Sequence, residues 1–452
     1  MNKLLCTFFA MCVGGGAQDT PAPAWKFAVS GDSRNCGDVV MPAVAAAVLK
    51  SGANFYWHLG DFRAIYDFDE DMAPPAALHL NTAHLNIISY LTKAWPDFIE
   101  HQLRPFGSLE VFLGIGNHET IFPQTREAYR KQFESYLNSA RLSAQRDADK
   151  DTGGFRTYYH WVMNGSVDFI SLDNASDNAF DAAQMAWFRK RLTDDRNSPA
   201  ITTVVVGMHE ALPGSKGMSH SMCDSPAGIE SGREVYNRLW DVRQGGKKVY
   251  LLASHSHYVM DDVYRTDYWG DRVLPGWIVG TAGAVRYRLP PGQNGSTVAR
   301  TDVYGYLLAT VMRDGSIQFE FKEISLDDLR LANAGKTPDS LVNWCYTENK
   351  EETIPVAAAC GERGRASRRS RARRRLRDGR SRASQHRRRS PLGDLGNQVH
   401  ELTAAVLPTV WRRSRAFSGL PRSGDSQNRA VLRPSGDFGA RDGRGLGPGR
   451  SA

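Results

Sequence analysis

The chain has 452 residues, of which 23% are charged and 41% are hydrophobic, enough for one large domain or two ordinary ones with a buried core. No apolar run after the first dozen residues approaches the roughly 18 residues of a membrane-spanning helix, which argues against an integral membrane protein. The net charge of +8 is unevenly distributed, because residues 361–452 hold 23 Arg, no Lys and 7 acidic residues, whereas residues 1–360 hold 34 basic and 42 acidic residues.

The first residues are typical of a secretory signal peptide. Lys3 precedes an apolar run from Leu4 to Val13, and small residues follow up to Ala17. We therefore expect residues 1–17 to be removed by cleavage after Ala17. The protein would then be exported, either to the periplasm or to the outside of the cell.

Four cysteines follow this segment, and an oxidising compartment allows a disulfide among them. We expect one disulfide and prefer the pair Cys36 and Cys223, although the sequence does not determine the connectivity. The four residues are Cys36, Cys223, Cys345 and Cys360.

Residues 24–345 alternate apolar, β-rich runs with helical patterns, as expected of an α/β domain. Helices are predicted over Val39–Lys50, Ala83–Gln102, Arg126–Leu142, Ala182–Leu192 and Gly232–Val242, and later strands over Trp277–Thr281, Gly305–Met312 and Ser316–Ile324. Five earlier strands each end at residue types that bind metals. They are Trp25–Ser30 before Gly31-Asp32, Phe55–Leu59 before Gly60-Asp61, Val111–Ile115 before Gly116-Asn117-His118-Glu119, Ile201–Val206 before Gly207-Met208-His209, and Val249–Ala253 before Ser254-His255-Ser256-His257.

The Arg-rich segment 361–452 has little apolar periodicity and is dense in Gly, Ser and Pro, so we predict that it is disordered. Three interpretations of it remain open. It could be a basic arm for nucleic acid or anionic lipid, a solvated tail, or the product of a frameshift in a GC-rich gene, which the absence of Lys beside so many Arg suggests. Nucleic-acid binding is not expected from the rest of the chain.

Ligands of open α/β sheets bind at the carboxyl ends of the strands, so the strand-terminal residues are expected to meet there. Their mixed oxygen and nitrogen donors suit Mn, Fe or Zn rather than calcium or a thiolate zinc site. Six ligands exceed the need of one tetrahedral ion, and a shared carboxylate lets two ions lie close together. Such a pair turns water into hydroxide for attack on a phosphoester. The predicted ligands are Asp32, Asp61, Asn117, His209, His255 and His257.

These five motifs, in this order, resemble those of the calcineurin-like metallophosphoesterases, which include the purple acid phosphatases. The match covers about residues 25–285, and Gly-Asn-His-Glu is its most specific part. The resemblance implies two mixed β-sheets packed as a sandwich and flanked by helices. It also implies that His118 acts as general acid or phosphate contact and that Asp61 bridges two ions. Asp32 and His257 would hold the first ion, and Asn117, His209 and His255 the second.

The chain departs from the family pattern near the first ion. Arg34 stands where many members have a ligand His, and Ala64 stands where purple acid phosphatases have a Tyr, with Tyr66 as the nearest tyrosine. Arg34 either binds the substrate phosphate, for which a guanidinium is well suited, or forms a structural salt bridge.

Ala64 also replaces the acidic residue that often orients the histidine of Gly-Asn-His-Glu, so His118 needs another partner, with Asp67 and Glu119 as candidates. His220 competes with His209 for the fourth motif. We prefer His209 because a strand precedes it, and we keep His220 as a candidate on the substrate side.

Together these patterns predict an exported hydrolase that cleaves phosphomonoesters or phosphodiesters with a hydroxide held by two metal ions, Mn, Fe or Zn. His118 and Asp61 are its expected catalytic residues, and Arg34 and His118 its expected substrate contacts. The altered first site favours one alternative, an exported binding protein without enzymatic activity and with a degenerate metal site.

Overall fold

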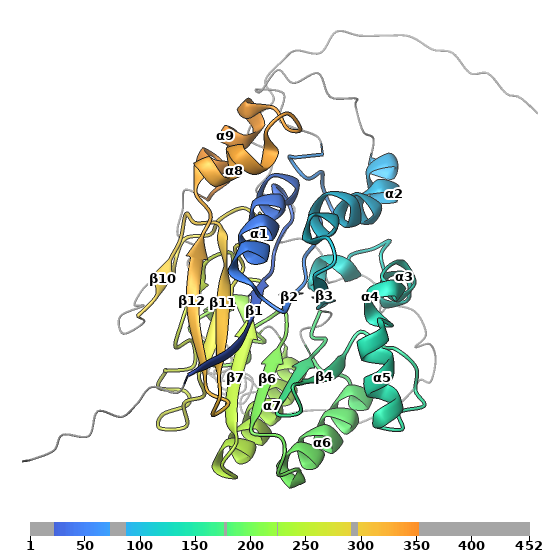
Figure 1. Ribbon diagram of the computed structural model, residues 1–452, viewed down its shortest axis with the longest axis vertical. Coiled ribbons are helices and arrows are strands. Elements are labelled where there is room, and N and C mark those ends of the chain that lie inside the picture. The colour runs from blue at the N-terminus through green and yellow to red at the C-terminus, as the bar shows by residue number, and fades with distance from the viewer. Residues whose placement is uncertain (1–21, 73–86, 176–178, 224, 291–296, 352–452) are drawn as a thin grey trace, which may run out of the picture. The chain divides into compact units, whose positions relative to one another are not determined.

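The structure of the protein is a computed structural model that describes residues 22–72, 87–175, 179–223, 225–290 and 297–351 (Figure 1). The expected signal peptide, the Arg-rich segment and the start of the helix predicted from Ala83 lie outside the described residues. Within these ranges, no helix combines the length and apolarity needed to cross a membrane.

The first sheet contains three of the motif-bearing strands. Its order is β12-β11-β1-β2-β3, in which β1, β2 and β3 are parallel and β11 pairs antiparallel with both β1 and β12. Ser30, His58 and Leu113 are register partners at the ends of the three parallel strands, so the loops that follow begin side by side. The strands are β1 (Pro23–Ser30), β2 (Phe55–His58), β3 (Glu110–Leu113), β11 (Gly305–Met312) and β12 (Ile317–Glu323).

The second sheet contains the other two motif-bearing strands, β6 and β7. Its order is β10-β8-β9-β7-β6-β5-β4, with β5, β6, β7 and β9 parallel and the remaining pairs antiparallel. Gly207 pairs with Leu252, which again places two motif loops side by side. The strands are β4 (Tyr159–Met163), β5 (Val167–Ser171), β6 (Thr203–Gly207), β7 (Lys248–Ala253), β8 (Val259–Met260), β9 (Gly276–Val279) and β10 (Ala299–Arg300).

Aromatic side chains pack the two sheets face to face. The Phe169 ring lies 5.0 Å from Phe27 and 5.2 Å from Phe55 between ring centroids, in edge-to-face contacts, and Trp161 stacks on Phe112 at 3.9 Å. Such contacts are favoured by the charge distribution of aromatic rings and add to the hydrophobic gain of burial. The expected sandwich of two mixed sheets is therefore confirmed, with an aromatic core between them.

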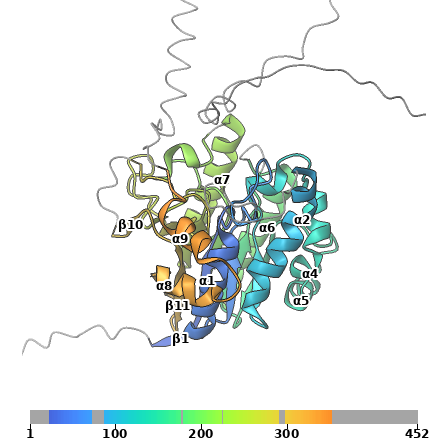
Figure 2. The ribbon, with the colours of Figure 1, turned by 90° about the horizontal axis from the view of Figure 1, so that it is seen from above.

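Helices cover the outer faces of both sheets (Figures 1 and 2). Helix α1 (Gly37–Ser51) lies against the first sheet, where Met41 contacts the hydroxyl of Tyr56, and α8 (Leu326–Asn333) lies beside it. Helices α6 (Ala182–Asn197) and α7 (Pro226–Gln244) pack their apolar residues against β6 and β7. The remaining helices are α2 (Ile87–Phe98), continued by η2 (Ile99–Leu103) and η3 (Arg104–Phe106), then η4 (Asn117–Thr120), α3 (Arg126–Gln132), α4 (Glu134–Leu137), α5 (Ala140–Ala148), η5 (Met218–His220) and α9 (Asp339–Thr347).

Several elements differ from expectation, and two of them have a clear local cause. The single helix predicted over Arg126–Leu142 is divided into α3, α4 and α5. The first break lies at Phe133, whose ψ angle of 22° leaves the helical conformation. The second lies at Ser139, whose side chain caps α5 by accepting from the backbone of Leu142. Strand β5 was not predicted. It forms a hairpin with β4 through Asn164-Gly165, both in the left-handed region that two-residue hairpin turns require.

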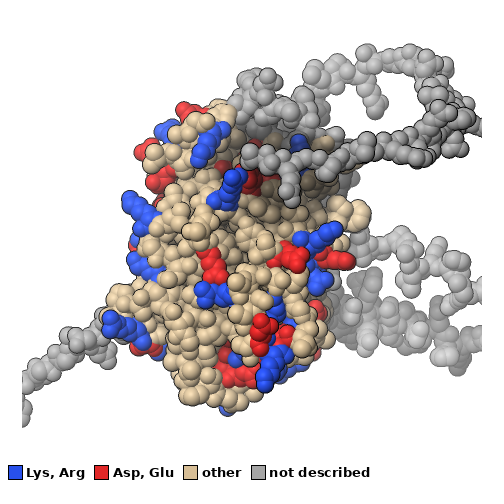
Figure 3. All heavy atoms as spheres, turned by 45° about the vertical axis from the view of Figure 1, so that its right-hand side comes forward, with Lys and Arg blue, Asp and Glu red and all other residues tan. Residues whose placement is uncertain are grey.

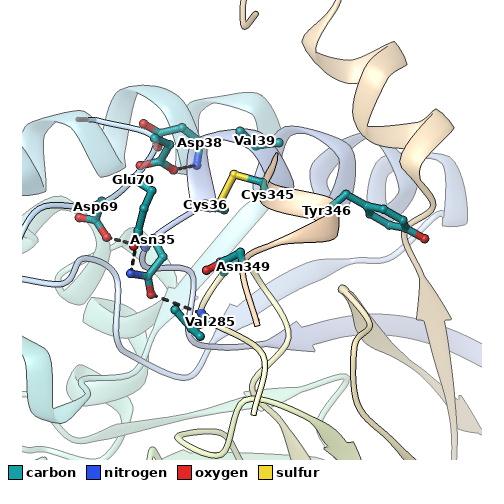
Figure 4. Close-up of a disulfide and its surroundings, with 12 residues drawn as sticks. Asn35, Cys36, Asp38, Val39, Asp69, Glu70, Val285, Cys345, Tyr346 and Asn349 are labelled. Atoms are coloured by element: carbon teal, nitrogen blue, oxygen red, sulfur yellow. Dashed lines mark hydrogen bonds between the residues drawn. A yellow bond between two sulfur atoms is a disulfide. The ribbon is translucent and has the colours of Figure 1, made fainter. Parts of the chain in front are cut away.

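The expected disulfide between Cys36 and Cys223 is wrong, because Cys36 pairs with Cys345, 309 positions away, with Cα atoms 5.9 Å apart (Figure 4). Cys36 directly precedes α1, and Cys345 lies on α9 with its side chain fully buried. Asn349, just beyond α9, donates to the carbonyl of Gly283 and to the hydroxyl of Tyr304. Packing of this C-terminal region, which the sequence pattern does not reveal, decides the pairing.

Charged side chains of both signs are interspersed on the face shown in Figure 3. Among the described residues on that face neither sign of charge dominates, in agreement with the weak acidic excess of residues 1–360.

Candidate metal centre

All six predicted ligands meet where the carboxyl ends of the two sheets join. Backbone and side-chain hydrogen bonds hold the sheets together there: the N–H of Gly31 donates to the carbonyl of Val279 at 3.0 Å, and the hydroxyl of Ser254 donates to the carbonyl of Leu59 at 3.1 Å. The predicted strand-end arrangement is thus present, with each ligand on a loop anchored by a buried strand. Four of the six are buried, namely Asp32, Asp61, His209 and His257.

Three ligands occupy an uncommon backbone conformation. Asp32, Asp61 and His255 have φ angles of 60°, 60° and 64°, in the left-handed region that residues other than glycine seldom adopt and that concentrates at functional sites. Gly116 has no such angle, but a Cβ atom there would collide with the carboxylate of Asp61. The glycine of Gly-Asn-His-Glu therefore allows the third motif to approach the second.

One group of ligands converges on the Nε2 atom of His209. That atom lies 2.9 Å from Asn117 Oδ1, 3.0 Å from His255 Nδ1 and 3.3 Å from Asp61 Oδ1. His209 Nδ1 lies 3.1 Å from the carbonyl oxygen of Leu59, which only accepts, so Nδ1 carries a proton and Nε2 can present a lone pair. Asp61, Asn117, His209 and His255 therefore present four donor atoms to one cation position.

The pKa shifts of His209 and Asp61 also indicate that positive charge is favoured at this position. Burial opposes protonation of His209, but the carboxylate of Asp61 outweighs it and raises the pKa of His209 to about 10, so a proton competes with a cation for the lone pair of Nε2. Burial likewise opposes ionisation of Asp61, yet His118 and His209 hold the pKa of Asp61 well below its usual range. Asp61 is thus ionised and needs cationic neighbours.

A second group consists of Asp32, Asp61 and His257, whose potential ligand atoms all lie within 4.8 Å of one another. His257 Nε2 lies 3.4 Å from Asp32 Oδ1. In the described part of the chain, the buried atoms Asp32 Oδ1 and Asp61 Oδ2 have no hydrogen-bond partner. Because buried carboxylate oxygens without partners are costly, these atoms fit a site that binds cations. Asp61 belongs to both groups, as the resemblance implies for a bridging ligand.

His118 is oriented by neither of the two candidates that the sequence suggested. Its Nδ1 atom lies 2.6 Å from the backbone carbonyl of Ala64. Asp67 accepts instead from the backbone of Phe68. The backbone carbonyl of Ala64 therefore orients the His118 ring in place of an acidic side chain.

Glu119 has a different role, since it ties the second and third motifs together. Its carboxylate accepts from the backbone N–H groups of Asp61, Phe62 and Gly116, at 2.9, 2.9 and 2.7 Å. Burial raises the pKa of Glu119 to about 7.

Arg34 lies inside the centre with 6% of its surface exposed. Its Nε atom is 3.9 Å from Asp61 Oδ2, and its Nη1 atom lies 3.4 Å from the hydroxyl of Tyr66. Tyr66 is 61% exposed, and its ring lies 5.2 Å from that of His118. Tyr66 therefore belongs to the rim of the centre.

Sequence reasoning missed Tyr287, which has no motif around it. Its ring stacks on His257 with centroids 3.9 Å apart, and its hydroxyl accepts from Arg34. His220 lies beside it, with ring centroids 5.1 Å from Tyr287 and 5.5 Å from His255. The position of His220 at the edge of the ligand cluster agrees with the substrate-side role expected of it, which remains a prediction.

No protein-family model and no curated protein matches this chain. Among solved structures it is similar to one described as PhoD, with 14% identity and a TM-score of 0.43 over 68% of this chain and 72% of the other. It is also similar to a provisionally assigned 5'-nucleotidase from Staphylococcus aureus in complex with alpha-ketoglutarate (12% identity, TM-score 0.37, 71% of this chain and 58% of the other). A third is a protein serine/threonine phosphatase from Saccharomyces cerevisiae with similarity to human phosphatase PP5 (13% identity, TM-score 0.26, 67% of this chain and 81% of the other). These likenesses are distant, so the case for a metal centre rests on its residues.

Proposed function

We propose that the chain is an exported hydrolase that cleaves phosphomonoesters or phosphodiesters at this metal centre. The convergence of six metal-ligand residues from two sheets, with Asp61 shared between two cation positions, carries the proposal. The disulfide between Cys36 and Cys345 supports export, because disulfides persist in oxidising compartments.

Metal bound in such a centre supplies Lewis acidity, which makes water a nucleophile at neutral pH and neutralises the phosphoryl oxygens. The residues of the chain orient the ligands and contact the substrate. Asp61, oriented by the backbone N–H of His118 at 3.0 Å, belongs to both groups and would hold a cation in either. His118 directs its Nε2 atom to the centre, 3.6 Å from Asp61 Oδ2. In the doubly protonated ring this atom would donate to a phosphoryl oxygen or protonate the leaving oxygen.

Hydrolysis of para-nitrophenyl phosphate and of its bis-ester tests the proposal. The full chain is stripped with a chelator and then given Mn, Fe or Zn. Turnover that the chelator removes and a metal restores is the expected result, and the preferred ester identifies the substrate class. Absence of turnover with every metal contradicts the proposal for these esters.

The contacts of Arg34 with His257 and Asp61, in the group that also contains Asp32, favour one alternative, an exported binding protein with a degenerate metal site. Such a protein binds metal and hydrolyses neither ester. The same measurement, combined with metal analysis, separates the two functions.

A further inference from the structure

The protonation pattern of His257 defines what its second nitrogen can bind. Its Nδ1 atom lies 2.7 Å from the backbone carbonyl of Val285. A carbonyl oxygen only accepts, so the proton of the neutral ring is on Nδ1 and the lone pair is on Nε2. A metal ion bound to Asp32, Asp61 and His257, which we call the first position, would bind to this lone pair.

Arg34 already directs a proton at this lone pair. Its Nη2 atom lies 3.4 Å from His257 Nε2, and its Nε atom lies 3.9 Å from Asp61 Oδ2. One lone pair cannot bind a guanidinium proton and a metal ion together. The guanidinium also keeps its positive charge at every ordinary pH, so it repels a metal ion placed next to it.

The guanidinium is held in this position by its other contacts. Nη2 donates to the hydroxyl of Tyr287 at 3.2 Å, and Nη1 donates to Asn35 Oδ1 at 3.3 Å. Tyr287 is in turn stacked on His257, so one aromatic ring supports both the arginine and the ligand that the arginine contacts. Arg34 is therefore part of the buried centre and not a mobile surface side chain.

A second site in the chain shows the same use of a buried arginine. Asp38, Asp97 and His101 form a further group of potential metal ligands. The fully buried Arg63 donates to both of these carboxylates and also to Asp71 at 3.1 Å. In that cluster a guanidinium supplies the positive charge that a metal ion could otherwise supply.

We infer that Arg34 is the resident cation of the first position, so that the chain binds one metal ion tightly, at Asp61, Asn117, His209 and His255, and uses a guanidinium in place of a second ion. This inference rests on the proposed function for its chemical meaning: the substrate's phosphoryl oxygens are neutralised by one metal ion and one arginine. The arginine also suits this task because its planar donors match phosphate oxygens.

Metal stoichiometry tests the inference without any need for turnover. The full-chain protein and its variants Arg34→His and Arg34→Lys are loaded with Mn²⁺ and dialysed, and bound metal per folded chain is measured by mass spectrometry. We expect one ion in the original protein and in Arg34→Lys, which keeps the positive charge. We expect two in Arg34→His, which removes the charge and adds a ligand. Circular dichroism confirms that each sample is folded.

Electron paramagnetic resonance gives a second readout, because an isolated Mn²⁺ ion and an exchange-coupled pair have different hyperfine patterns. The original protein is expected to show the isolated pattern and Arg34→His the coupled one. Two tightly bound ions in the original protein, no bound ion, or one ion in Arg34→His would each overturn the inference. If the original protein binds two ions and hydrolyses the esters, the inference about Arg34 is wrong and the proposed hydrolase stands. If it binds one ion and hydrolyses neither ester, the inference is supported and the proposed hydrolase is contradicted.

Discussion

The Nδ1 nitrogen of His118 lies 2.6 Å from the carbonyl oxygen of Ala64. The imidazole therefore donates from Nδ1 and turns Nε2 toward Asp61, whose Oδ2 atom is 3.6 Å away. A backbone carbonyl is held by the fold, so it orients the ring without a carboxylate. The ring of His118 is thus oriented although this sequence lacks the acidic partner that the resemblance led us to expect.

His118→Ala should lower kcat for para-nitrophenyl phosphate about 10²–10⁴-fold, the usual contribution of a general acid or base. Bound metal should not change, because His118 belongs to neither group of potential ligands. Steady-state kinetics and metal analysis of the same samples check both statements. Loss of metal in this variant would instead make His118 a ligand.

Asp61→Asn and His255→Ala should abolish turnover and lower the bound metal while leaving the fold intact. Asp61 is common to both ligand groups, and His255 Nδ1 faces His209 Nε2 at 3.0 Å. The matched control is His101→Ala, at a histidine outside this centre whose side chain is 54% exposed. Turnover and metal content are measured for all three. Full activity in both ligand variants would remove the basis of the proposed function.

Removal of the disulfide should lower the free energy of unfolding by about 2–5 kcal/mol, because the bond closes a very long loop in the unfolded chain. Cys36→Ser, Cys345→Ser and the double variant are compared by urea denaturation. Since each single variant already breaks the bond between the two residues, the double variant should be little less stable than either. Additive losses would show that the cysteines contribute separately and that the bond does not form.

His160 should make the stability of the second sheet depend on pH. Burial opposes its charge, but contacts with Asp168 and Asp149 outweigh burial and raise the pKa of His160 from 6.5 to about 9. Because the folded pKa lies above the unfolded one, the stabilisation is complete below pH 6.5 and is lost as the pH rises through 9. It amounts to about 3 kcal/mol.

Urea denaturation across this pH range, with His160→Gln as the comparison, measures that contribution. The nearby Asp195, whose pKa is raised by burial to about 8, changes stability in the same direction and is itself affected by the charge of His160. The difference between the two proteins therefore measures His160 together with its effect on Asp195. Identical pH profiles would show that His160 does not titrate as the geometry requires. Arg191, which also contacts Asp149 and Asp168, is unchanged in the comparison.

Much of the ligand cluster could be predicted from the sequence because each ligand follows a recognisable strand. Parallel strands end at the same edge of a sheet, so strand-terminal residues such as Asp32 and Asp61 must lie near one another. The signals for these strands are local: short apolar runs that end at glycine or serine. The same local signals do not show how β5 inserts between β4 and β6, since pairing partners are chosen by packing.

The sequence by itself determined the α/β class, the order of the candidate metal-binding motifs and the residue types available at each strand end. Only the tertiary structure decided that Cys36 pairs with Cys345, that the carbonyl of Ala64 orients His118, and that Arg34 faces His257. The last contact joins residues 223 positions apart. Such contacts depend on how two sheets and the segments after the last motif pack together, and packing between distant segments leaves no periodic trace in the sequence.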